Sequence, residues 1–154
     1  MPKIDLAQAK TRTTSAYPAQ FKHVAVGREK IVLGDVAGLT QFGVNLTRLK
    51  PGAASALRHW HENEDEFIYV LEEEIALVED EGETRLLPGD AAGFKAGVPN
   101  AHHLVNKSAR DAVYLEIGTR AKAERAHYPD VDLALVSDGK TLRFTRKSGE
   151  PYAE

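Results

Sequence analysis

The side chains best suited to chemistry lie close together in one stretch of the sequence, residues 57–70. His59 and His61 are separated by one residue, so in an extended chain both imidazoles point to the same side. Glu66 begins the next apolar run, and after a turn it can bring a carboxylate back beside them. Neutral imidazole together with carboxylate suits a divalent first-row metal ion. The spacing therefore points to a metal site.

A fourth ligand could come from the pair His102 and His103, which begins another apolar run after a turn. An isolated His-x-His pair in a β protein is nevertheless more often exposed or merely hydrogen-bonded than bound to metal. Glu62, Glu64 and Asp65 have the composition of a solvated turn. The metal interpretation therefore depends on the sequence that surrounds these residues.

The composition of the 154-residue chain excludes several other kinds of site. The chain has no cysteine, which excludes disulfides and any thiolate nucleophile or ligand. The formal net charge is -3 and the basic residues are scattered, which argues against a nucleic-acid partner. No apolar window approaches the ~20 residues that a membrane helix needs, and the start of the chain lacks the pattern of a signal peptide. We therefore expect a cytoplasmic protein that does not bind membranes.

Short apolar runs separated by Gly, Pro, Asn or charged turns predict an all-β domain, and their regular spacing is typical of a sandwich or barrel. The segment Arg120–Ala126 is rich in Ala, Lys and Glu and is predicted to form a short helix. A hairpin is expected around Asp138-Gly139. The nine expected strands are Lys30–Leu33, Gln41–Leu49, Glu66–Leu71, Ile75–Glu79, Thr84–Leu87, Ala91–Phe94, Ala101–Asn106, Ala112–Ile117 and Thr141–Thr145.

Two segments resemble the sequence motifs of the cupin superfamily. Residues 52–73 resemble the first motif, in which a Gly precedes His-x-His, Glu and a closing Gly; its places are filled by Gly52, His59, His61 and Glu66. Residues 89–106 resemble the second motif, in which a Gly leads to Pro-x-Gly, His and Asn; its places are filled by Gly89, Gly97, His102 and Asn106. More loosely, the chain from about residue 27 to residue 132 is similar to small bacterial single-domain cupins of largely unassigned chemistry.

Three positions depart from these motifs. Glu73 stands where the first motif closes with Gly, so a strained or altered turn is expected there. Lys95 replaces the usual Pro of the second motif. Two extra residues separate Gly97 from the histidine, and His102 is preferred over His103 because only His102 keeps the motif's spacing to Asn106.

The resemblance implies a cupin fold, which is a jelly-roll barrel (double-stranded β-helix) with few short helices. We expect one domain over residues 1–154. It would consist of an N-terminal arm (1–26) on the outside of the barrel or on a partner subunit, a core barrel with both motifs (about 40–118), and a C-terminal extension (119–154). Open edge strands and the arm favour a homodimer.

The resemblance also implies a divalent metal ion held by His59, His61, Glu66 and His102, for which Zn, Fe, Mn and Ni all stay open. Such a protein would be a metalloenzyme that acts on a small oxygenated metabolite, either an isomerase such as a sugar-phosphate isomerase or a dioxygenase. The alternative is a non-catalytic cupin that binds or senses a small molecule or a metal.

Other polar residues could hold a substrate near this ion. Arg48, Arg58 and Tyr114 are the candidates for substrate binding, and Lys95 is a further cation for a phosphate group. The remaining polar candidates are Gln41, Asn45, Trp60, Tyr69 and Glu116. The side-chain alternation of strands predicts an apolar barrel lining from Ile68, Val70 and Leu104.

Overall fold

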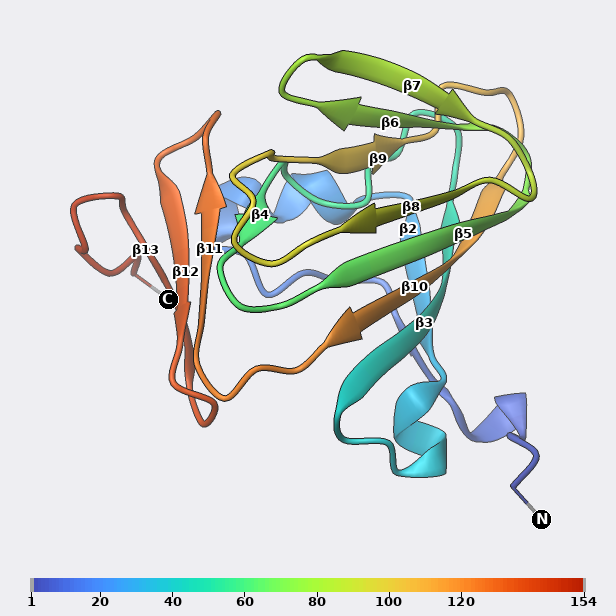
Figure 1. The fold of residues 1–154 in the computed structure, drawn as a ribbon, viewed down its shortest axis with the longest axis horizontal. Coiled ribbons are helices and arrows are strands. Elements are labelled where there is room, and N and C mark those ends of the chain that lie inside the picture. The colour runs from blue at the N-terminus through green and yellow to red at the C-terminus, as the bar shows by residue number, and fades with distance from the viewer. Residues whose placement is uncertain (1, 154) are drawn as a thin grey trace.

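The computed structural model describes residues 2–153, and its regular secondary structure consists mainly of strands (Figure 1). No helix among them is long and apolar enough to span a membrane. The strands are β1 (Lys10–Arg12), β2 (Arg28–Val32), β3 (Phe42–Leu49), β4 (Trp60–His61), β5 (Glu66–Glu72), β6 (Ile75–Glu79), β7 (Gly82–Leu86), β8 (Ala91–Phe94), β9 (His103–Val105), β10 (Ala112–Thr119), β11 (Glu124–Tyr128), β12 (Leu133–Ser137) and β13 (Leu142–Thr145). The helices are short 3-10 turns, namely η1 (Leu6–Gln8), η2 (Ala19–Ala25) and η3 (Gly34–Ala37).

The expectation of an all-β cupin jelly roll is confirmed, and all nine expected strands are present with ends within two residues of the expected ones. The expected helix over Arg120–Ala126 is wrong, because the second half of that segment is strand β11. Glu124, Ala126 and Tyr128 are buried while Arg125 is exposed, which is the alternation of a strand. Pairing with β12 and β4 therefore overrides a weak helix preference.

The barrel is formed by two sheets that face each other across one hydrophobic core. The larger sheet has the order β1-β2-β3-β10-β5-β8 and the smaller has the order β7-β6-β9. Both sheets contribute inward side chains to the core, which contains Leu49, Ala53, Ile68, Val70, Ile75, Leu77, Leu86, Leu104, Ala112 and Tyr114. The expected lining by Ile68, Val70 and Leu104 is thus confirmed.

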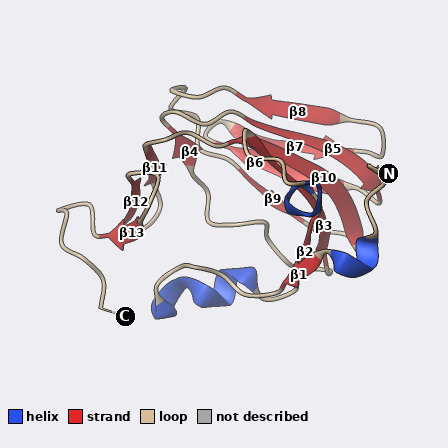
Figure 2. Cartoon of the chain, turned by 90° about the horizontal axis from the view of Figure 1, so that it is seen from below, coloured by secondary structure: helices blue, strands red, loops and turns tan. Residues whose placement is uncertain are grey.

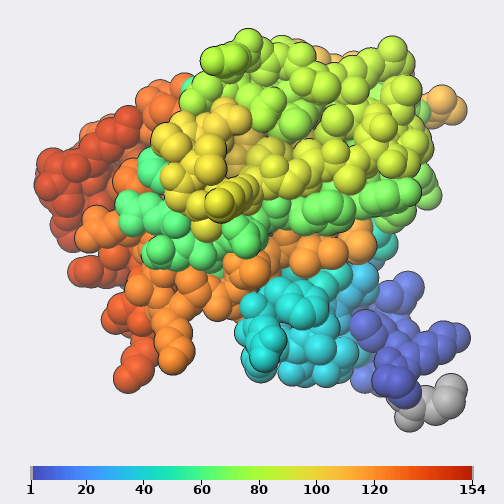
Figure 3. Space-filling model, viewed as in Figure 1, coloured from blue at the N-terminus to red at the C-terminus, as the bar shows by residue number. Residues whose placement is uncertain are grey.

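A third sheet, β13-β12-β11-β4, stands at one end of the barrel and is built mainly from the C-terminal extension (Figures 1 and 2). The expected hairpin around Asp138-Gly139 joins its strands β12 and β13. A second core lies beneath this sheet, where Tyr17 of the N-terminal arm packs edge-on against Tyr128 and Phe144. Figure 3 shows the extension, in orange and red, covering this end of the molecule. Both flanks of the chain therefore pack against one another beside the barrel.

The N-terminal arm also extends the large sheet. Strand β1 pairs antiparallel with β2, with Lys10 opposite Val32, so the arm covers that edge of the barrel. The turn between β5 and β6 holds Glu73 at a φ of 60°, and it is the one non-glycine residue with positive φ in the described range 2–153. The strained turn expected at this position is therefore confirmed.

Candidate metal centre

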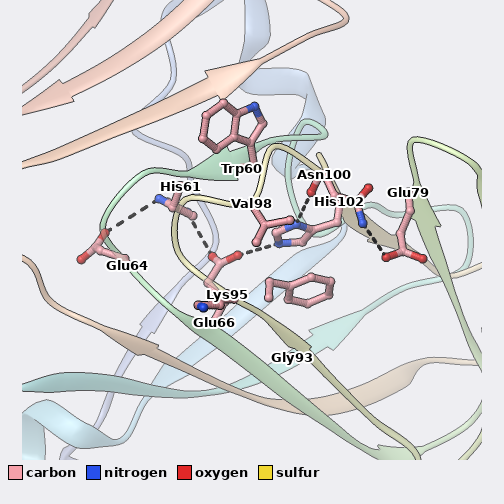
Figure 4. Close-up of a pocket in the computed structure, with 11 residues that line it drawn as sticks. Trp60, His61, Glu64, Glu66, Glu79, Gly93, Lys95, Val98, Asn100 and His102 are labelled. Carbon is pink, nitrogen blue, oxygen red and sulfur yellow. Dashed lines mark hydrogen bonds and ion pairs between the residues drawn. The ribbon is translucent and has the colours of Figure 1, made fainter.

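Three segments of the chain bring the histidines and the carboxylate of the two motifs together, and Figure 4 shows His61, Glu66 and His102 of this group. His59 and His102 face each other in an antiparallel bridge, with backbone N–H groups donating to the opposite carbonyl oxygens at 3.1 and 2.9 Å. His61 lies in β4, which β11 holds in place through the Ala126–His61 pair. Glu66 is the first residue of β5, and its side chain points inward in phase with Ile68.

The Nε2 atoms of all three histidines lie near the Glu66 carboxylate. His102 Nε2 is 2.6 Å from Oε2, His61 Nε2 is 3.1 Å from Oε1, and His59 Nε2 is 3.8 Å from Oε1. The donor atoms of His59, His61 and Glu66 all lie within 4.8 Å of one another. His103 points elsewhere, and its Nδ1 donates to Ala56 O at 2.7 Å. The structure thus brings together the four residues expected from the sequence, with His102 and not His103 beside Glu66.

Backbone carbonyl groups orient two of these rings. His59 Nδ1 lies 2.7 Å from Leu57 O and His102 Nδ1 lies 3.4 Å from Asn100 O. Because a carbonyl oxygen only accepts, each Nδ1 carries the proton, which leaves Nε2 to face the carboxylate. An Nε2 lone pair beside a carboxylate is repulsive unless a cation is shared between them. Either a proton or a metal ion can be that cation.

Burial strengthens this electrostatic arrangement. Burial alone would raise the pKa of Glu66, but hydrogen bonds with His102, His59 and His61 outweigh it and hold the pKa well below its usual range. Burial alone would lower the pKa of His61, but Glu66 and the neighbouring carboxylates of Glu124 and Glu64 raise it overall. The centre is therefore a partly buried carboxylate surrounded by imidazoles, and it favours positive charge.

Aromatic side chains hold the histidine rings from outside. Phe94 stacks on His102 with ring centroids 3.5 Å apart and an interplanar angle of 3°. Tyr128 of the C-terminal extension stacks on His59 at 5.5 Å. Such packing restricts ring rotation and fixes the direction of each Nε2 atom.

The other nitrogen of His61 faces a second pair of carboxylates. Its Nδ1 lies 3.8 Å from Glu124 Oε2 and 3.9 Å from Glu64 Oε1, and it is buried without a hydrogen-bond partner. The donor atoms of His61, Glu64 and Glu124 also lie within 4.8 Å of one another. The sequence interpretation placed Glu64 in a solvated turn and assigned Glu124 to a helix, so neither was expected beside the centre. The available signal for Glu124 was the alternation of apolar and polar residues in Arg125–Tyr128, which places Glu124 on the same strand face as Ala126 and Tyr128.

Cavities of about 190, 190 and 200 Å³ each include Glu66 in their walls. The first opens beside β4 and the loop 95–100, and it is lined by Trp60, His61, Glu64, Glu66, Glu79, Gly93, Phe94, Lys95, Val98, Asn100 and His102 (Figure 4). The second occupies the barrel interior and is lined by Tyr17, Arg28, Lys30, Ser55, Ala56, His59, Glu66, Ile68, Phe94, His102, His103, Leu104, Tyr114 and Glu116. The third lies between Glu116 and Arg120. Space for a small molecule therefore adjoins the centre.

Of the residues expected to bind substrate, one lies at the cavity beside Glu66 and two do not. Tyr114 lines the interior cavity, as a substrate residue must. Arg48 is exposed and lies 3.7 Å from Asp111, and its place on β3 directs it away from the barrel interior. Arg58 is held by Asp130, with bonds of 3.0 Å from both Nε and Nη2. Neither arginine lines the cavities at Glu66, because each is engaged with carboxylates elsewhere.

Two cations in the interior cavity were not expected from the sequence. Arg28 and Lys30 lie on β2 with their side chains on the inner face of the large sheet. Lys30 Nζ donates to Glu116 Oε1 at 2.9 Å, and Asn45 Nδ2 donates to the same oxygen at 3.1 Å. The alternation of β2 was the signal that could have found them, but the sequence interpretation began this strand at Lys30.

Comparison with known proteins places the chain in a family. Residues 45–118 match the model of the cupin domain, which covers both histidine motifs. A comparison with curated proteins gave no match. The chain belongs to the cupin superfamily, as its resemblance to both motifs predicted.

Solved structures of similar proteins include two described as sugar phosphate isomerases. The chain is 46% identical to a sugar phosphate isomerase of the cupin superfamily from Silicibacter pomeroyi, with a TM-score of 0.94 over 99% of this chain and 97% of the other. It is 28% identical to a putative sugar phosphate isomerase from Acidithiobacillus ferrooxidans, with a TM-score of 0.74 over 82% and 81% of the two chains. A polyketide cyclase from Streptomyces resistomycificus, 21% identical with a TM-score of 0.62 over 77% and 79%, shares the fold.

Proposed function

We propose that this cupin is a metal-dependent isomerase of a phosphorylated sugar. The observation that carries the proposal is the convergence of three Nε2 atoms on the partly buried Glu66 carboxylate. The similarity along nearly the whole chain to a sugar phosphate isomerase supports the substrate class. The interior cavity of about 190 Å³ beside this cluster can admit a small molecule.

The residues present fit a divalent cation. Imidazole and carboxylate are ligands for Zn, Fe, Mn and Ni, and the chain has no thiolate that would favour a closed structural site. We assign the ligands as His59, His61, His102 and Glu66. A bound ion with open positions would polarise the substrate's carbonyl or hydroxyl oxygen.

Isomerisation also needs a group that moves a proton between adjacent carbons. Glu116 is the carboxylate of the interior cavity that is not among the assigned ligands. Its Oε1 accepts hydrogen bonds from Lys30 and Asn45, which fixes the carboxylate in position. We assign the proton transfer to Glu116, with apolar neighbours such as Ile68 excluding water.

The metal assignment is tested by elemental analysis of protein purified without added metal. We expect a stoichiometric ion in the wild type and in His23→Ala, a control because His23 is exposed and far from the centre in sequence. His59→Ala and His102→Ala should lose most of it. Sub-stoichiometric metal that His59→Ala leaves unchanged would contradict the assignment.

The catalytic assignment is tested by following aldose–ketose interconversion across a panel of phosphorylated sugars. Glu116→Gln should lower kcat by about 10²- to 10⁴-fold while metal content is unchanged. Glu72→Gln, at an exposed end of β5, is the matched control and should keep full activity. Stoichiometric metal without turnover of any sugar phosphate would favour the alternative of a non-catalytic binding cupin. Metal-dependent oxygen consumption would favour a dioxygenase.

A further inference from the structure

The inner face of the large sheet holds a cation that no carboxylate neutralises. Arg28 donates from Nη1 to Ser55 O at 2.6 Å and from Nη2 to Thr14 O at 3.1 Å. Within residues 2–153 its guanidinium forms no ion pair, and its Nε is buried without a hydrogen-bond partner. Carbonyl groups on two sides therefore fix its orientation while its charge stays uncompensated. Such a group is suited to bind an anion.

Hydroxyl groups without partners lie on the same inner face. Tyr114 and Thr47 are fully buried and are direct neighbours in the β3–β10 register, and neither Tyr114 Oη nor Thr47 Oγ1 has a hydrogen-bond partner. Burial raises the pKa of Tyr114 well above its usual range, so the hydroxyl stays protonated and able to donate. Unsatisfied buried polar atoms carry a cost, and a ligand that accepts from them removes it.

The register places these groups in order along the cavity. Lys30 pairs with Thr47, and Thr47 pairs with Tyr114, so these three residues form one row, and Arg28 lies two residues before Lys30 on β2. Glu116 lies two residues further along β10, and Gly118, which pairs with Glu66, lies two residues beyond it. Each step of two residues spans about 7 Å in a strand. A molecule anchored at Tyr114 would thus extend past Glu116 toward the candidate metal centre.

We propose that Arg28 and Tyr114 form the subsite for the phosphoryl group of the substrate, with Lys30 at its side; this assignment rests on the proposed function. The charge of Arg28 and its unpartnered Nε suit an oxyanion, and the Tyr114 hydroxyl can donate to a further oxygen of the same group. The subsite sets the direction of the substrate, with the phosphoryl end inward at β2 and the reacting carbons between Glu116 and the histidines.

The test measures binding of inorganic phosphate by isothermal titration calorimetry to the protein as purified. Tyr114→Phe and Arg28→Met should each weaken phosphate binding about 10- to 100-fold. Tyr69→Phe, which removes an exposed hydroxyl from the outer face of the same sheet, is the matched control and should leave it unchanged. Acetate is the comparison ligand, and affinity equal to that of phosphate would overturn the phosphoryl assignment in favour of a carboxylate.

Stability separates a binding role from a structural one. Because Tyr114 Oη has no partner in the protein, Tyr114→Phe should unfold at the same temperature as the wild type or a higher one. Arg28→Met removes two hydrogen bonds to backbone and is expected to unfold at a lower temperature, so the tyrosine variant keeps the test decisive.

A Tyr114→Phe variant that binds phosphate as tightly as the wild type would overturn the subsite. If Tyr114→Phe binds phosphate normally while the wild type holds a stoichiometric metal ion and turns over a sugar phosphate, the subsite is wrong but the proposed function stands. Loss of metal and turnover with intact phosphate binding would contradict the proposed function alone.

Discussion

Asn106 is a buried side chain that joins two parts of the barrel, and its replacement measures how much these contacts stabilise the fold. It is fully buried, and its Nδ2 donates to Leu49 O and to Arg110 O at 2.8 Å each. Its Oδ1 accepts from Ser108 N at 2.9 Å and from Ser108 Oγ at 2.7 Å. One side chain thus joins the end of β3 to the turn between β9 and β10. Asn106→Ala removes all four hydrogen bonds and leaves buried backbone groups unpaired.

The expected loss of stability follows from these contacts. A net contribution of about 0.5–1.5 kcal/mol per hydrogen bond, taken at the low end for the two local bonds to Ser108, gives a loss of about 3 kcal/mol. For a chain of this length that corresponds to a fall of about 6–12 °C in Tm. Because the amide bonds to Leu49, Ser108 and Arg110 and not to the histidine cluster, metal content at 20 °C should be unchanged.

Thermal unfolding followed by circular dichroism, together with urea titration, measures this loss. Asn63→Ala is the control, because Asn63 is exposed and its side chain makes one hydrogen bond, to Ala123 O at 3.0 Å. It should cost about 1 kcal/mol or less. A Tm for Asn106→Ala within about 2 °C of the wild type would refute the reasoning. Loss of metal from a folded Asn106→Ala would instead place the residue in the site.

Three further predictions concern other parts of the molecule. Glu73→Gly should be more stable than Glu73→Ala by about 0.5–1 kcal/mol in urea titrations, because Gly relieves the positive φ at some cost in unfolded-chain entropy. Arg58→Met should lower stability by roughly 1–2 kcal/mol, since its carboxylate partners are partly exposed, and should leave KM for the sugar phosphate unchanged. The outer face of β5 exposes Phe67, Tyr69 and Leu71 by 42%, 41% and 45%. We expect a homodimer through this face, and light scattering should then report a monomer for Tyr69→Glu but a dimer for the wild type.

The sequence predicted the barrel strands well because each is a short, largely apolar run bounded by turn or charged residues. In β5 the run Phe67–Leu71 is apolar on both faces, and only the structure shows that Ile68 and Val70 are buried while their neighbours are exposed. Strand β11 lacked that advantage, since its Ala, Glu and Arg content also suits a helix. Its identity depends on pairing with β4, more than 60 residues earlier in the chain. The expected division into arm, barrel and extension within one domain stays a prediction.

The candidate site was predictable where its residues share a short spacing. Only a short turn separates His61 from Glu66, and His59 lies two residues before His61. This short spacing was enough to predict that the three side chains lie close together. His102 was identified by its spacing to Asn106 in the second motif. Arg28 and Glu124 were not expected, because their places beside the site result from strand register between distant segments. Local spacing therefore identified the candidate ligands, and tertiary pairing supplied their surroundings.

The flanking segments belong to the site, although both motifs lie in the barrel. Strand β11 supplies the only paired neighbour of β4 in the described sheet order, and β4 carries His61. The next residues of β11 lead to Tyr128, which stacks on His59 and packs against Tyr17 of the arm. A barrel without the extension would therefore leave the β11-facing edge of β4 unpaired and would remove the stacking contact on the His59 ring. The C-terminal extension positions two of the four candidate ligands, and the arm supports it from the other side.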